Sequence, residues 1–529
     1  MVGLIASLAT LFVAVAIYLL TRGPRIRRQG QALRRPPNTL PLVGNGLLFL
    51  QARHKLFSWF EKCEQQFGFE TFEISVPSLP PAVVINDPEN LKAVLQNEHM
   101  FEKGDFFKLR SWDLFVSSRL VIFKKLELTF FPGPKGNGIV NADGQLWRVQ
   151  RKAGLNFLNS PNLQALTDVV LPFHLQSTIS HLRASTEDVA DLEPVFLELT
   201  TQIMGQMAYN MDMHADDPFF RSFELASAAT GRRVQNPLWQ ITERLPSSQV
   251  HEAILKVKRF GNAIVASAVH AREAKHQDGH QEARSAAAVS GSLINSLLDA
   301  IPDHELVADA ALNFLSAGRD TTAQALTWTF YLLMRHPQVV RRLRDEVAAA
   351  LGRESGADDG REMKCHGAPF LRPATMPYTM AVFYEALRLY PPVPVELKQC
   401  TSTTLLPDGT HLPEGTLVVW CIWAMNRSTL IWGEDARSFS PERWMEEGEL
   451  ITRSAYEFPV FNGGRRTCLG KAMAEHIAIT VIAKLIWLFD FEPLDHKERV
   501  SRNSLTLPMD GGLPCRVKSR VNATSQAPI

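Results

Sequence analysis

The chain has 529 residues, 45% of them hydrophobic and 21% charged, so it is long enough to bury a large core and lacks the composition of a disordered protein. Its 56 basic and 55 acidic residues give a formal net charge of +1, which provides no overall attraction to nucleic acid. Six cysteines are scattered without close pairs, which argues against a disulfide framework or a Cys-x-x-Cys zinc site and indicates a reducing compartment.

The N-terminal segment carries no charge from Val2 to Leu20, a stretch about as long as the ~20 residues that a helix needs to cross a bilayer. Arginines follow at positions 22, 25, 27, 28, 34 and 35, which by the positive-inside rule keeps the rest of the chain in the cytosol. We expect residues 1–21 to form an uncleaved transmembrane anchor, with a cleaved signal peptide as the alternative. Residues 22–46, first basic and then too rich in proline and glycine for a helix, are expected to run extended, as an ordinary linker or as a hinge, before a domain over 47–529.

The first part of this domain mixes both kinds of secondary structure. Residues Thr71 to Ile74 and Ala82 to Ile85 read as short strands, and Pro88 to Gln96 as a helix. From about residue 162 to residue 275 the pattern is helical throughout, and it indicates no particular chemistry.

Trp147 and Arg151 are four residues apart, so they share one face of the helix expected from about Asn141 to Leu155. An indole N–H and a guanidinium on one face suit an anionic group such as a haem propionate. Taken alone, the pair reads more simply as a core tryptophan beside a surface arginine.

A long helical pattern from His304 to Met334 contains the run Ala317 to Thr322. A glycine in mid-helix lowers the stability of the helix by ~1 kcal/mol. Such a locally unfavourable residue indicates a ligand site or, alternatively, a structural kink. The small residues of this run would let a flat ring and its bound dioxygen approach, while Thr321 hydrogen-bonds the oxygen and Asp320 relays protons.

The run from Phe461 to Gly470 precedes another long apolar helical pattern. A cysteine at a helix N-terminus lies near unpaired N–H groups, which favour its thiolate, and the glycines leave room for a cofactor. We interpret Cys468 as the axial ligand of a haem iron and Arg466 as a partner of a haem propionate. A buried inert cysteine is the plainer alternative; a phosphate-binding loop fails because the spacing of the glycines is wrong.

These motifs resemble the cytochrome P450 family. The last run matches its signature Phe-x-x-Gly-x-Arg-x-Cys-x-Gly at every fixed position: Phe461, Gly464, Arg466, Cys468 and Gly470. Three further elements are similar to family motifs in the same order along the chain, namely Trp147 with Arg151, the run 317–322, and Glu385 and Arg388 followed by Pro441-Glu442-Arg443.

The resemblance implies a mainly α fold with small β-sheets and a single haem b. It implies that Glu385, Arg388 and Arg443 form a buried ion network that supports the haem-binding core. It also implies catalytic roles for Asp320 and Thr321, iron ligation by Cys468, and cofactor binding by the following residues: Trp147, Arg151, Ala317, Gly318, Arg466, Cys468 and Gly470.

No flavin or nicotinamide fingerprint is visible in the sequence. The resemblance therefore implies a monooxygenase that uses O2 and takes electrons from a separate NADPH–cytochrome P450 reductase at the endoplasmic reticulum membrane. A basic docking face for that partner is expected from four residues: Arg148, Lys152, Arg465 and Lys471.

Several segments look most like the fungal and plant branch that hydroxylates alkanes and fatty acids, among them 138–144, 432–436 and 507–513. That branch also tailors secondary metabolites, so both kinds of hydrophobic substrate stay open. Two other functions remain alternatives: a reductase-independent enzyme that rearranges hydroperoxides, and a non-enzymatic haem sensor. Residues 116–130 depart from the family pattern and read as either an insertion or translated intron sequence.

Overall fold

The computed structural model describes residues 26–41, 43–76, 79–111, 138–184, 189–236, 239–243, 249–277, 292–354 and 371–520, together with Ser7, 10–13 and Val15. Most of the predicted anchor and the whole segment 116–130 lie outside these residues. Within the described part of the chain, no helix combines the length and the apolar character needed to cross a membrane. The anchor therefore remains a prediction.

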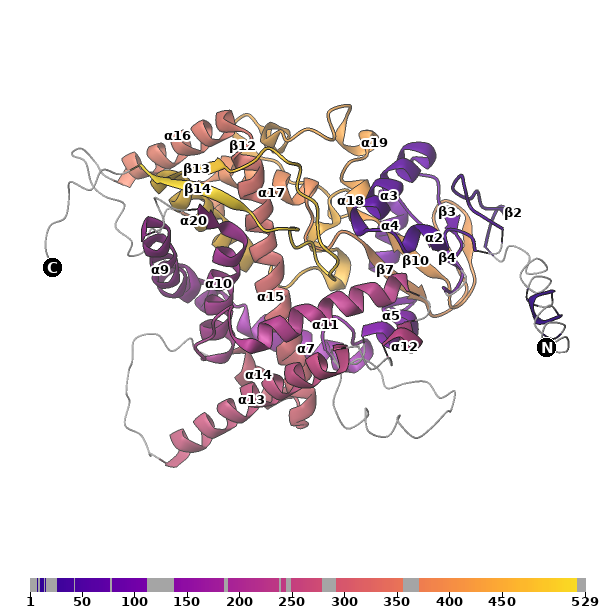
Figure 1. Cartoon of the computed structure of the whole chain (residues 1–529), viewed down its shortest axis with the longest axis horizontal. Coiled ribbons are helices and arrows are strands. Elements are labelled where there is room, and N and C mark those ends of the chain that lie inside the picture. The colour runs from indigo at the N-terminus through magenta and orange to yellow at the C-terminus, as the bar shows by residue number, and fades with distance from the viewer. Residues whose placement is uncertain are drawn as a thin grey trace, which may run out of the picture.

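The described chain is dominated by helices, as predicted (Figure 1). Their bounds are α2 Gly46–Phe49, α3 Arg53–Phe67, α4 Pro88–Gln96, α5 Gly104–Ser111, α7 Gly144–Phe157, α8 Ser160–Ala165, α9 Leu171–Ala184, α10 Leu192–Met204, α11 Pro218–Gln235, α12 Trp239–Thr242, α13 Val250–Gln277, α14 Leu293–Ala300, α15 His304–Leu333, α16 Pro337–Glu354, α17 Pro377–Leu389, α18 Ile422–Met425, α19 Thr429–Trp432 and α20 Lys471–Leu488.

Short strands form four small sheets. The orders are β2-β1-β9-β8, β3-β4-β10-β7-β5, β11-β12 and β13-β14-β6. The strands are β1 Arg27–Arg28, β2 Gln31–Ala32, β3 Phe72–Ile74, β4 Ala82–Val84, β5 Phe101–Glu102, β6 Val189–Asp191, β7 Glu396–Cys400, β8 Thr404–Leu405, β9 Thr410–Leu412, β10 Leu417–Trp420, β11 Met445–Glu446, β12 Glu449–Leu450, β13 Phe489–Pro493 and β14 Pro514–Ser519.

Part of the predicted hinge belongs to the first of these sheets. Strands β1 and β2 pair with each other, and β1 pairs with β9 through Arg27 opposite His411 and Arg28 opposite Thr410. The hinge segment is thus tied to the folded body after its first few residues. Strand β6 interrupts the region that was expected to be helical throughout, because it pairs with β14 near the C-terminus.

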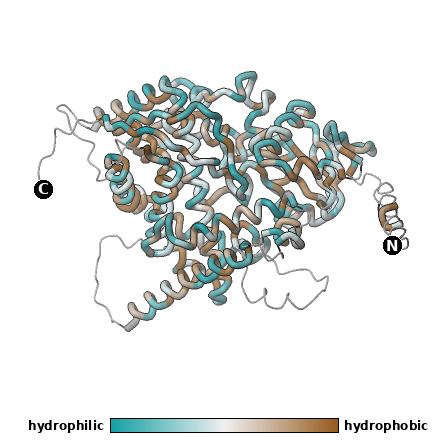
Figure 2. The backbone as a smooth tube through the Cα atoms, viewed as in Figure 1, coloured by the Kyte–Doolittle hydropathy of each residue, from teal (hydrophilic) through white to brown (hydrophobic). Residues whose placement is uncertain are grey.

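Helix α15 runs through the middle of the molecule, and α10, α17 and α20 pack against it (Figure 1). Asp303 caps its N-terminus by accepting the backbone N–H of Glu305 at 2.9 Å, and Pro337 follows its C-terminal end. The helix is buried all round along most of its length, as is α20 from Ile477 to Ile486. Elsewhere apolar and polar residues alternate along the helices (Figure 2), which is typical of helices with one face toward a core.

Candidate functional site

The cysteine loop is built by backbone geometry that requires glycine. Gly464 has a φ of +61°, and a Cβ there would lie 2.3 Å from the carbonyl oxygen of Leu95 on α4. The backbone N–H of Cys468 donates to the carbonyl of Phe461 at 2.7 Å and closes the loop. Gly470 then precedes α20, and a Cβ on it would meet no atom within 4 Å. The loop therefore presents the cysteine beside open space.

Cys468 differs from the other described cysteines. Its side chain is exposed, whereas Cys63, Cys400, Cys421 and Cys515 are buried. The surrounding protein nevertheless raises the pKa of the Cys468 thiol through desolvation, while the N–H of Gly470 and the Arg151 guanidinium act to lower it. An accessible sulfur that is still largely enclosed by protein is what an iron ligand inside a cofactor pocket needs.

A matching accessible stretch interrupts the buried surface of α15. Residues 307–315 and 322–333 are buried, but Ala317 is exposed and Gly318 and Thr321 are partly exposed. The Thr321 hydroxyl donates to the Ala317 carbonyl at 2.6 Å, so the pair forms one polar spot on this stretch. The predicted distal residues are thus the part of the central helix that a ligand can reach.

Gly154 of α7 shows that the loop and α15 lie close together. A Cβ on Gly154 would come within 3.0 Å of both Leu469, next to the cysteine, and Phe314, one turn before Ala317. The two predicted halves of the site therefore meet at α7, the helix that also carries Trp147 and Arg151.

Gly318 has a further reason to be glycine that the sequence did not indicate. A Cβ on Gly318 would lie 2.5 Å from the sulfur of Met204 on α10. The missing side chain allows α10 and α15 to approach each other closely. Its predicted role in admitting a flat ring stays a prediction.

Trp147, Arg151 and Arg466 lie together, as their predicted common role requires. The guanidinium carbons of Arg466 and Arg151 lie 4.3 and 5.5 Å from the centre of the Trp147 ring, and Arg151 also donates to the Thr467 carbonyl at 3.0 Å. Burial lowers the pKa of Arg151. Arg466 pairs with Asp143 at 2.6 Å.

Lys398 on β7 belongs to this group and was not predicted. Its amine is buried without a hydrogen-bond partner in the described structure, and burial, followed by Arg466 and Lys103, lowers its pKa to about 8. Alternation along β7 buries Lys398 and Cys400 on one face. The sequence offers one signal for Lys398, a lysine on the inward face of a strand. This signal can be read only after the strand itself has been recognised.

The electrostatic cluster around Lys398 has more cations than anions. Among the described residues it comprises five cations and three carboxylates: Lys103, Lys108, Arg151, Lys398 and Arg466, with Glu98, Asp143 and Glu396. The five positive and three negative charges leave a net charge of +2. A haem carries two propionates, so the residues present fit the predicted cofactor in both charge and iron ligand.

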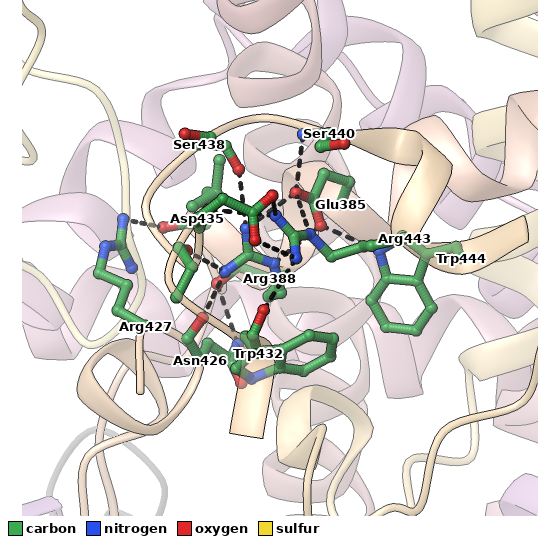
Figure 3. A network of polar contacts seen from close by, with 12 residues as sticks. Glu385, Arg388, Asn426, Arg427, Trp432, Asp435, Ser438, Ser440, Arg443 and Trp444 are labelled. Atoms are coloured by element: carbon green, nitrogen blue, oxygen red, sulfur yellow. Dashed lines mark hydrogen bonds and ion pairs between the residues drawn. The ribbon is translucent and has the colours of Figure 1, made fainter. Parts of the chain in front are cut away.

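A second charged cluster supports the core behind the site (Figure 3). Glu385 and Arg388 are both fully buried and form two contacts, at 2.7 and 2.8 Å. Glu385 also accepts from Arg443 and from the Trp444 indole, each at 2.9 Å. Backbone carbonyls, including that of Ser438, accept the remaining Arg388 donors. The predicted buried ion network is present.

The four cations expected to bind a redox partner are all on the surface. Arg148 and Lys152 are exposed on α7, and Arg465 and Lys471 are exposed around the cysteine loop. Their exposure is what a docking role requires.

Comparison with known proteins agrees with these observations. A family model described as Cytochrome P450 matches residues 35–515. Similar curated proteins include Cytochrome P450 94A1 of Vicia sativa, 27% identical over 92% of this chain and 90% of that protein. Cytochrome P450 94B1 of Arabidopsis thaliana is 28% identical over 92% of each chain, and Cytochrome P450 86B1 of the same plant is 29% identical over 98% of this chain and 90% of its own length.

Proposed function

We propose that this chain, which belongs to the cytochrome P450 family, is a membrane-anchored monooxygenase that hydroxylates long-chain hydrophobic substrates. As a member of that family it is an oxidoreductase with a haem-thiolate iron cofactor. What remains to be proposed is the role of each site residue, the source of electrons and the substrate.

One observation carries the proposal. Residues 307–333 of α15 are buried except for one accessible stretch, and Asp320 and Thr321 lie on that stretch. When bound, the haem supplies the activation of dioxygen. Cys468 would hold its iron, and Trp147, Arg151, Arg466 and Lys398 would hold its propionates. Thr321 would present a hydroxyl at the reaction site, and Asp320 beside it would relay protons to that site.

The acid–hydroxyl pair favours a monooxygenase over the two alternatives. Hydroxylation with O2 consumes two protons and two electrons for each product and each water. Rearrangement of a hydroperoxide consumes none, and a haem sensor needs no proton delivery either. Retention of Asp320 and Thr321 at the accessible stretch is therefore explained by the first function alone.

The electrons would come from a membrane-bound NADPH–cytochrome P450 reductase, because the sequence carries no flavin or nicotinamide fingerprint. The exposed cations at 148, 152, 465 and 471 would attract its acidic surface. The uncharged N-terminal segment would anchor the protein in the endoplasmic reticulum with the catalytic domain in the cytosol.

An alkane- or fatty-acid-type substrate is supported by the segments that look like that branch of the family. The structure adds exposed apolar side chains just after the predicted anchor, at Leu40, Val43, Leu47 and Leu50. Such residues suit a surface that lies against the bilayer, from which a hydrophobic substrate would enter.

The test is turnover of lauric acid by the purified holoenzyme with reductase, NADPH and O2. The proposal expects hydroxylated product that requires all three components. Product formed only from a fatty-acid hydroperoxide, with no need for reductase, would establish the rearranging enzyme instead. Binding of haem with no turnover of either substrate would leave the sensor.

A further inference from the structure

A polar cavity of about 270 Å³ lies on the side of α15 that carries Asp320. Helices α10, α11 and α15 and the C-terminal segment 502–508 form its walls, and the charged residues among them are Glu193, Glu224, Arg319, Asp320 and Arg502. Charged side chains are unusual walls for an internal space, so this cavity suits water and ions better than an apolar substrate.

The lining of the cavity includes both exposed and buried side chains. Glu224 and Arg502 are exposed at one part of its lining, while Glu193 and Arg319 are almost fully buried. Beside the cavity, Gln324 of α15 donates to Thr506 of the C-terminal segment at 2.8 Å, and Ser227 of α11 hydrogen-bonds with Ser504 at 3.2 Å. The path from exposed to buried walls is therefore held in place by fixed contacts.

Asp320 is a partly buried member of this lining. One of its carboxylate oxygens pairs with Arg319 at 2.6 Å, and Ser316 donates to the other at 3.4 Å. At 3.6 residues per turn, Asp320 is about 60° around α15 from Ala317. A carboxylate in this position borders both the cavity and the accessible stretch of the helix.

Glu193 is the second buried carboxylate in the wall, and nothing in the reaction described so far uses it. One oxygen accepts the backbone N–H of Met509 at 3.0 Å, and Arg502 lies 3.5 Å away. Burial raises its pKa to about 7, which Arg502 opposes and the carboxylates of Asp191 and Glu224 reinforce. Arg319 and Asp320 face the same cavity from α15. At neutral pH Glu193 can therefore both accept and release a proton.

We propose that this cavity is the route by which protons reach Asp320, and that Glu193 holds and passes them between the exposed mouth and the buried end. The proposal rests on the monooxygenase function proposed above. It assigns a further residue, Glu193, to that reaction. Glu193 would act through Asp320, so it is a positioning residue and not a catalytic one.

The balance of the reaction provides a sharp test. With O2, the substrate C–H bond and O2 combine with two electrons and two protons to give an alcohol and water. An organic hydroperoxide delivers an oxygen atom to the same C–H bond and leaves as its own alcohol, with no net uptake of protons or electrons. A residue that only delivers protons should matter for the first reaction and not for the second.

The variant is Glu193→Gln in the holoenzyme, because glutamine can still accept the Met509 N–H. With reductase, NADPH and O2 we expect product formation to fall by about tenfold or more, with a larger solvent deuterium isotope effect. With cumene hydroperoxide and the same substrate we expect wild-type turnover. An infrared carboxylic-acid band that titrates near pH 7 in the wild type should be absent from the variant.

Two controls complete the experiment. Glu198→Gln changes a carboxylate on the same helix that pairs with His214 outside the cavity, and it should behave as the wild type in both reactions. Glu193→Asp keeps a carboxyl group and should recover part of the lost rate.

Wild-type behaviour of Glu193→Gln in both reactions would overturn the proposal, and so would equal loss in both, which would indicate structural damage. A wild-type protein that hydroxylates nothing with reductase would instead refute the proposed function itself. The two failures are therefore distinguishable.

Discussion

The protein contains two charged clusters, which differ in how far their own residues balance their charges and satisfy their hydrogen-bond donors. In the cluster around Glu385, this carboxylate pairs with Arg388 and Arg443, and Arg443 also pairs with Asp435, so the charges of these four residues balance; backbone carbonyls accept the spare donors of Arg388 (Figure 3). The cluster around Lys398 and Arg466 has a net charge of +2 and leaves the Lys398 amine without a hydrogen bond in the described structure.

This difference distinguishes a cluster that stabilises the fold from a cluster that binds a ligand. A balanced buried network needs nothing from outside and breaks down when any member is removed. A buried cluster with excess charge is costly until a ligand of opposite charge arrives. Both clusters contain arginines and carboxylates, so the balance of charge and the satisfaction of hydrogen-bond donors distinguish support of the core from recognition of a cofactor.

The largest expected effect is at the balanced cluster. Glu385→Gln leaves the buried Arg388 and Arg443 guanidiniums without their carboxylate, which should cost about 3–5 kcal/mol of unfolding free energy. We expect little or no soluble holoprotein, measured by yield and by urea denaturation. The matched control is Glu492→Gln at an exposed pair with Lys518, which should cost at most about 1 kcal/mol. Equal effects of the two variants would contradict the comparison.

The next effect is at the unbalanced cluster and has the opposite character. Lys398→Met removes a buried cation that lacks a partner, so it should weaken haem retention without destabilising the haem-free fold. Transfer of haem to an excess of a haem-accepting protein should be faster from the variant. Lys518→Met at an exposed position of β14 serves as the control and should release haem at the wild-type rate.

The same variant makes a pH prediction. The pKa of Lys398 is lowered to about 8 from its ordinary 10.5, so between these values the unfolded chain binds more protons than the folded one. Stability of the haem-free wild type should therefore rise with pH across this window, and Lys398→Met should lose that rise. The measurement is the denaturation midpoint of wild type and variant from pH 7 to about pH 11. If Lys398 is not a buried cation with a lowered pKa, the two curves of midpoint against pH will run parallel.

The smallest effect is expected at Arg465, which is exposed between Gly464 and Arg466 and belongs to neither cluster. Because Arg465 contributes to neither cluster, Arg465→Pro should leave haem binding intact and reduce only the salt-sensitive association with reductase. Haem content and reductase-dependent turnover at low and high salt measure this. Loss of haem from the variant would show that Arg465, and not Arg466, supports the cofactor.

The sequence predicted those elements whose signals are local. The long pattern 304–334 and the helix 88–96 match α15 and α4 nearly to the residue, because caps and proline mark their ends. Strand β6 was missed because three residues pair only with a partner more than 300 positions away. The family assignment was confirmed.

The site was predicted where motifs carry it and missed where packing does. Cys468, Arg466 and Trp147 follow from short patterns, whereas Lys398 becomes visible only when β7 places it inward. The close approach of Gly318 to Met204, and the wall of Glu193 beside Asp320, depend on how α10 lies against α15. Such contacts between distant segments leave no pattern in a single sequence.

The most direct test of the account is the absorption spectrum of the reduced, carbon monoxide-bound protein and of its Cys468→Ala variant. We predict the red-shifted band of thiolate-ligated haem in the wild type, its loss in Cys468→Ala, and its retention in Cys63→Ala, because Cys63 is buried on α3 in a different hydrophobic cluster. Absence of the band from the wild type, or its persistence in Cys468→Ala, would contradict the assignment of Cys468 as the iron ligand.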